Sequence, residues 1–172
     1  MEQSFMKEQK VLPLVLSMSL PMVISMAVNS LYNIVDSYFV AKYSEDAMTA
    51  LALVFPVQNF INAVVIGFGI GMNAMAAFYL GAGAQEKASR TATQGTLFNF
   101  LHGIVLAAAC IAGMPLFLRM FAPGEAVTEM ALAYSRRAFL FAPAIALGLA
   151  FEKLFQAVGC MKVSMICMMC GF

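Results

Sequence analysis

The sequence carries few charged residues, and this scarcity decides the class of protein. Only 11% of its 172 residues are Asp, Glu, Lys or Arg, whereas 62% are hydrophobic, and soluble domains carry about 25% charged residues. The formal net charge of +1 provides no basic surface for a nucleic acid. We therefore predict an all-α membrane protein, a polytopic helical bundle whose surroundings are the lipid bilayer.

Side chains that bind metals or carry redox chemistry are also scarce. The one histidine, His102, lies inside an apolar stretch. A proton relay is one interpretation, but we favour a hydrogen bond to a neighbouring helix. The four cysteines have apolar surroundings, and Cys167-x-x-Cys170 has no second ligand pair, so we interpret them as small buried thiols. We expect no cofactor and no enzyme, because an embedded active site needs a paired acid–base or metal set.

Long apolar stretches divide the chain into membrane spans. We predict spans at about 11–41, 49–80, 92–118 and 130–158, and a shorter apolar stretch at 163–172. A final stretch of ten residues covers about 15 Å as a helix, half of the hydrocarbon core, so we expect residues 1–172 to be a fragment of a longer polytopic protein. The first apolar run is too long for a cleavable signal peptide and should stay as an anchor.

Basic residues in the connections set the expected orientation. Six would lie on one side of the membrane and four on the other; these are Lys7, Lys10, Lys87, Arg90, Lys153 and Lys162 against Lys42, Arg119, Arg136 and Arg137. Because cytoplasmic loops are enriched in Lys and Arg, we expect the N-terminus in the cytoplasm. Arg136 and Arg137 should lie in the first turns of the fourth span, where they can extend to the headgroups.

The first span holds a polar face with an acid in it. Ser25, Asn29, Asn33 and Asp36 follow one another at spacings of four, four and three residues, which places them on one side of a helix. Pro21 lies upstream and should bend the helix. An ionisable residue in a membrane helix usually faces a bundle interior or an aqueous cavity and marks an ion or substrate path. The alternative is that Asp36 lies near enough to the helix end to reach headgroup water.

The second span has no charged residue but contains amides and glycines. Gln58, Asn59 and Asn62 precede Gly67 and Gly71. These two glycines form a small-xxx-small pair that would allow close helix packing. The Gly-x-Gly-x-Gly pattern is not a nucleotide fingerprint, because no strand precedes it.

Several segments together resemble the multidrug and toxic compound extrusion (MATE) family. They are Pro21 with Leu31-Tyr-Asn-Ile-Val-Asp-Ser-Tyr-Phe-Val40, Ala50-Leu-Ala-Leu-Val-Phe-Pro56, Gly67-Phe-Gly-Ile-Gly71, Gly81-Ala-Gly-Ala-Gln-Glu-Lys-Ala88 and Phe155-Gln-Ala-Val-Gly-Cys-Met-Lys-Val-Ser-Met165. The resemblance covers residues 11–170, with a pattern closer to bacterial members of the MepA-like or DinF-like type.

The resemblance implies a twelve-helix antiporter of the MOP superfamily with two six-helix lobes, of which this chain would hold the first four to five helices of the N-terminal lobe, without the second lobe. It implies a bacterial inner-membrane protein that exports organic cations and drugs, xenobiotics among them, in exchange for protons or sodium, and that needs the missing lobe for transport. Asp36 matches the family's cation-responsive acid, Asn33 its neighbouring asparagine, and Pro21 the hinge. The proton or sodium site would consist of Asp36, Asn33 and Asn29. The predicted cavity-lining residues are Tyr32, Gln58, Asn59, Asn62, Gly67 and Gly71.

Other functions remain open at this point. A flippase for lipid-linked precursors or polysaccharides would have an anionic cargo and should therefore show basic residues in the lobe interior. The acid in the first span argues instead for a cationic cargo. A membrane-embedded enzyme and a small membrane scaffold complete at 172 residues are the alternatives from other classes.

Overall fold

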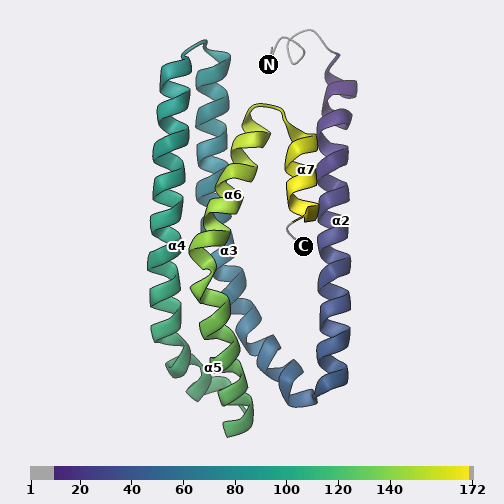
Figure 1. The fold of residues 1–172 in the computed structure, drawn as a ribbon, viewed down its shortest axis with the longest axis vertical. Coiled ribbons are helices and arrows are strands. Elements are labelled where there is room, and N and C mark those ends of the chain that lie inside the picture. The colour runs from purple at the N-terminus through teal and green to yellow at the C-terminus, as the bar shows by residue number, and fades with distance from the viewer. Residues whose placement is uncertain (1–9, 171–172) are drawn as a thin grey trace.

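Helices and short connections make up the whole described part of the chain. The computed structural model describes residues 10–170, which form the helices α2 (Val11–Tyr43), α3 (Glu45–Gly81), α4 (Gln85–Phe121), α5 (Glu125–Leu140), α6 (Ala142–Ala157) and α7 (Met161–Cys170) (Figure 1). The segment before residue 10, with the expected cytoplasmic N-terminus, and the last two residues of the final apolar stretch lie outside the described residues.

Three of the described helices are long enough to cross a membrane alone. By length and composition α2, α3 and α4 each qualify, and the bent pair α5–α6 would make a fourth span. This confirms the all-α membrane class. The helices extend past the expected apolar spans: α3 begins at Glu45 rather than near 49, and α4 at Gln85 rather than near 92. Hydropathy marks only the part of a helix that suits lipid, whereas helix ends depend on capping.

The start of α3 shows how a polar stretch becomes helix. The Ser44 side chain accepts hydrogen bonds from the backbone N–H groups of Asp46 (3.1 Å) and Ala47 (3.5 Å). This is an N-cap, and the acids Glu45 and Asp46 suit the positive end of the helix dipole. Only Ser44 therefore separates α2 from α3.

The fourth span, expected at 130–158, consists of two helices. The chain forms α5 and α6 with a bend of 45° between them. Pro143 lies in the first turn of α6; it has no N–H for a helix bond, and its ring clashes with the preceding turn. As a result Arg136 and Arg137 lie near the C-terminal end of α5, not in the first turns of a span.

The bundle core is formed by α3, α4, α5 and α6, and small residues recur at every fourth position of α6. On α6 the fully buried positions are Ala142, Ala146 and Ala150. A Cβ atom added to Gly103 of α4 would lie 2.9 Å from the Ala146 Cβ. Small side chains let helix backbones approach closely, which is how helices associate in lipid. Helix α2 stands apart from this core and packs chiefly against α7 (Figure 1).

Candidate functional site

The polar face of α2 is partly organised within the helix itself. The Asn33 side-chain amide donates hydrogen bonds to the Asn29 backbone carbonyl (2.9 Å) and to Asn29 Oδ1 (3.0 Å). These bonds use the Nδ2 atom of Asn33 and leave its Oδ1 as an acceptor. The four-residue spacing seen in the sequence thus brings Asn29 and Asn33 into direct contact.

Asp36 lies one turn farther along this face. No ion pair joins Asp36 to another described residue. Asp36 lies seven residues before the end of α2 at Tyr43, or about 10 Å along the helix axis. The Asp36 side chain is exposed.

The expected hinge residue Pro21 is buried, and α2 continues through it as one helix. Two serine hydroxyls bind backbone carbonyls beside it: Ser25 Oγ donates to the Pro21 carbonyl (3.0 Å), and Ser17 Oγ to the Leu14 carbonyl (2.8 Å). Pro21 has no N–H, so the backbone carbonyl of Ser17 loses its helix bond, and the back-bonding of Ser25 to the Pro21 carbonyl also favours bending. The local bonding therefore suits a hinge, although the helix is unbroken.

The amides of α3 do not join the polar face of α2 by any hydrogen bond in the described part of the chain. Gln58 and Asn62 are half-buried, and Asn59 is exposed. Their place in a cavity stays a prediction.

Gly67 and Gly71 do not form the expected close helix contact. A Cβ atom at either position would meet no atom within 4 Å. The glycine between them, Gly69, makes that contact instead, because its added Cβ would lie 3.0 Å from Lys153 Cγ of α6. Gly67 and Gly71 line an open groove between α3 and α4 of about 780 Å³.

His102 also lines this groove, and its bond differs from the expected one. Its Nδ1 lies 2.7 Å from the Phe98 carbonyl of the same helix, not from a neighbouring helix. The ring meets α3 by stacking on Phe68, with centroids 4.0 Å apart. If Nδ1 carries the proton of this bond, Nε2 is a free acceptor.

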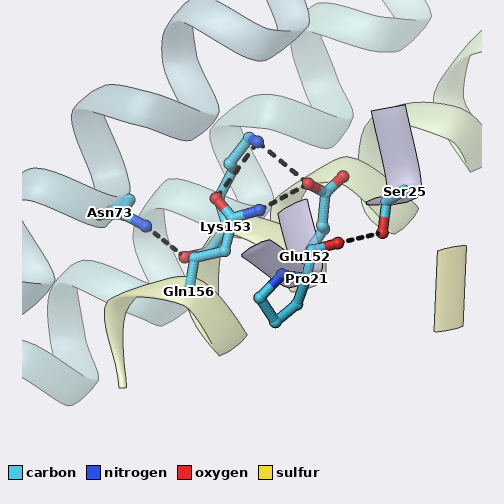
Figure 2. A network of polar contacts seen from close by, with 6 residues as sticks. All are labelled: Pro21, Ser25, Asn73, Glu152, Lys153 and Gln156. Atoms are coloured by element: carbon cyan, nitrogen blue, oxygen red, sulfur yellow. Dashed lines mark hydrogen bonds and ion pairs between the residues drawn. The ribbon is translucent and has the colours of Figure 1, made fainter. Parts of the chain in front are cut away.

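A polar cluster near the end of α6 was not singled out by the sequence interpretation. Lys153 Nζ lies 3.0 Å from Glu152 Oε1 and 3.3 Å from Gln156 Oε1, and Gln156 Nε2 donates to Glu152 Oε1 at 2.7 Å. Figure 2 shows these side chains in the same close view as Pro21 and Ser25 of α2. Both charged side chains are only 14% exposed. The signal in the sequence was Gly69 and Asn73 one turn apart on α3, which accommodate Lys153.

A second missed residue is Asn99, which is fully buried between α4 and α6. Its Nδ2 donates to the Ala146 carbonyl at 3.0 Å, whereas its Oδ1 has no hydrogen-bond partner among the described residues. The signal in the sequence was its position four residues after Gly95 and four before Gly103, which places Asn99 on the glycine-containing face of α4.

Comparison with known proteins gives one family and one fold. The family model MatE matches residues 21–172. A curated FAD transporter of Shewanella oneidensis is 27% identical over 86 residues, which are 50% of this chain and 19% of that protein.

Solved transporters share the architecture. A MOP superfamily transporter of Pyrococcus furiosus superposes with a TM-score of 0.86 at 24% identity and covers 90% of this chain. A MATE protein in complex with MaL6 superposes at 0.85 with 28% identity and the same coverage. In both cases this chain spans 34% of the solved transporter.

Proposed function

Because the chain belongs to the MatE family of membrane transporters, we propose that it forms part of the N-terminal lobe of a bacterial inner-membrane antiporter, with the second lobe lying outside this sequence. This antiporter exports organic cations in exchange for protons or sodium. The family consists of transporters rather than enzymes. The observation that carries the proposal is the polar face of α2, where Asp36 lies one turn from the bonded pair Asn29 and Asn33.

The chemistry of this face suits a small cation. A carboxylate without an ion-pair partner in the described residues is stabilised by a proton or by Na⁺, and the Asn33 Oδ1 is an oxygen ligand of the kind that hard cations prefer. A cation bound there neutralises the negative charge on this face of α2. A cationic substrate competes for the same charge.

Coupling follows from the hinge. Binding shifts a two-state equilibrium only by the difference in affinity for the two states. Pro21 lies fifteen positions before Asp36 on the same helix, and its surroundings are bonded through Ser25 rather than by a full set of helix bonds. Neutralising Asp36 therefore changes which bend of α2 is favoured, and the lobe changes its access state.

The test is dye efflux from cells that express the protein carrying this sequence. Asp36→Asn keeps the size and most hydrogen bonds but cannot exchange a proton or supply a full charge, so coupled export should be lost while membrane content is unchanged. Asp36→Glu should retain partial export. Thr49→Ala, which changes an exposed residue near the start of α3 outside the predicted cavity, serves as a control for substitution alone. Export at the wild-type rate by Asp36→Asn would remove this residue from the mechanism.

An anionic cargo is the second candidate, favoured by the similarity to the FAD transporter over half of this chain. The same cells distinguish the two cargoes. Export of FAD that is saturable and unaffected by the cationic dye would support the second candidate. Export of the dye, with no effect of added FAD, would support the first.

A further inference from the structure

A groove runs along the α3–α4 hairpin on the side turned away from α6. Its volume is about 780 Å³, and it is lined by Ala63, Val64, Gly67, Phe68, Gly71, Met72, Met75, Thr91, Gln94, Gly95, Phe98 and His102. The described residues that bond to α6, Asn73 and Asn99, are not in this lining. We propose that the groove binds one acyl chain of an anionic phospholipid whose headgroup lies at Lys87.

The length of the groove fits one leaflet. On α4 the lining extends from Thr91 to His102, eleven residues or about 16 Å along the helix. Half of the hydrocarbon core is about 15 Å. The groove begins near the start of α4 at Gln85, so it runs from the membrane surface to the middle of the bilayer.

The surface end of the groove carries a cation. Lys87, Thr91, Gln94, Phe98 and His102 follow at spacings of four, three, four and four residues, so they share one face of α4. Lysine at this level attracts anionic headgroups.

An aromatic ring lies beside Lys87 at the surface end of the groove. Lys87 Nζ lies 5.9 Å from the ring centroid of Tyr79, near the end of α3. Tyrosine and lysine at helix ends are typical of the headgroup level. The cation and the ring together therefore mark where a headgroup would lie.

The walls of the groove suit an acyl chain. No charged side chain lines it, and its hollow exists because Gly67 and Gly71 present no side chain. A flexible chain of methylenes fits between Phe68, Phe98 and the methionines, whose soft side chains adapt to its shape.

The experiment is native mass spectrometry of the full-length protein that carries this sequence, incubated in detergent with phosphatidylglycerol or with phosphatidylcholine. The wild-type chain should keep one phosphatidylglycerol molecule in preference to phosphatidylcholine. Gly71→Leu places a side chain in the groove, and because its Cβ atom meets nothing within 4 Å, the variant should lower this occupancy at least fivefold. Gly113→Leu is the matched control, because a Cβ atom there also meets nothing within 4 Å and the position lies outside the groove.

The headgroup is tested with a matched pair of lysines. Lys87→Gln should lower phosphatidylglycerol occupancy roughly fivefold, the factor expected of one basic residue near an anionic surface, and leave phosphatidylcholine unchanged. Lys42 lies 4.8 Å over the Tyr38 ring but is on α2 and not in the lining of this groove, so Lys42→Gln should change neither lipid.

Three results would overturn the proposal. The first is wild-type occupancy in Gly71→Leu, and the second is an equal loss in Lys87→Gln and Lys42→Gln. The third concerns cell membranes: a photo-crosslinking amino acid at Phe98 should form an adduct with lipid, and an adduct with protein would assign the groove to a helix instead.

Discussion

The side-chain amide of Asn73 donates a 2.7 Å hydrogen bond to the backbone carbonyl of Lys153, and this bond joins α3 to α6 across 80 positions of sequence. One turn before Asn73, Gly69 leaves room for the aliphatic stem of the same lysine. The hydrogen bond from Asn73 and the space beside Gly69 therefore fix the backbone and the side chain of the same α6 residue, Lys153. The seam between these helices combines close packing with polar bonds inside an apolar bundle.

We expect Asn73→Ala to lower the free energy of unfolding by about 1 kcal/mol, because hydrogen bonds between membrane helices contribute roughly 0.6 to 1.7 kcal/mol. Asn59→Ala removes an exposed amide from the same helix and should change stability by less than about 0.5 kcal/mol. Unfolding in a denaturing detergent, followed by circular dichroism, measures both. Equal losses in the two variants would show that the bond to Lys153 does not stabilise the seam.

We expect Gly103→Ala to destabilise the bundle by about 1–3 kcal/mol, the usual effect of overpacking. The added Cβ would lie 2.9 Å from the Ala146 Cβ and 3.0 Å from the backbone Cα of Pro143, so α4 and α6 must separate. Gly113→Ala in the same helix meets no atom within 4 Å and should be neutral or stabilise by up to about 1 kcal/mol, because alanine favours helix. The same unfolding assay compares them, and a neutral Gly103→Ala would contradict the observed packing.

We expect Glu152→Gln to lower stability by about 2 kcal/mol or more, because Lys153 loses its counter-charge in a place where it is only 14% exposed. The double variant Glu152→Gln with Lys153→Met should recover most of this loss, since the methionine stem still fills the space beside Gly69. A double-mutant cycle on the unfolding free energy measures the coupling. Additive losses would mean that the ion pair contributes nothing.

We expect the connection between α2 and α3 to lie outside the cell and the connection between α3 and α4 in the cytoplasm, from the six-to-four distribution of basic residues. In a background without the four native cysteines, Tyr43→Cys should react with an impermeant thiol reagent in intact cells, and Glu86→Cys should react only after permeabilisation. The reverse pattern would invert the orientation.

The helices were predictable because lipid imposes a strong rule: apolar runs of sufficient length become helices. Their ends were less predictable, since Ser44 starts α3 through a side-chain cap that hydropathy does not record. The break between α5 and α6 had its signal in Pro143, but a proline inside a span bends one helix as readily as it separates two.

In the candidate site, contacts within one helix were predictable from the sequence, whereas contacts between helices were not. Spacing within one helix was enough to place Asn29 beside Asn33. Contacts between helices depend on rotation and depth, which a single sequence does not specify. For that reason the close contact was assigned to Gly67 and Gly71 when Gly69 makes it, and the partners of Lys153 were not identified.

The packing of α2 has a consequence for the order of events during biosynthesis. Its chief neighbour is α7, which begins at Met161, 118 positions after α2 ends at Tyr43. At 5–20 residues per second the ribosome needs on the order of ten seconds to make that interval. Throughout this time α2 is in the bilayer without its main partner. The bond between Asn33 and Asn29 lies wholly within α2. It can therefore satisfy the hydrogen-bonding groups of these two amides before α7 has been synthesised.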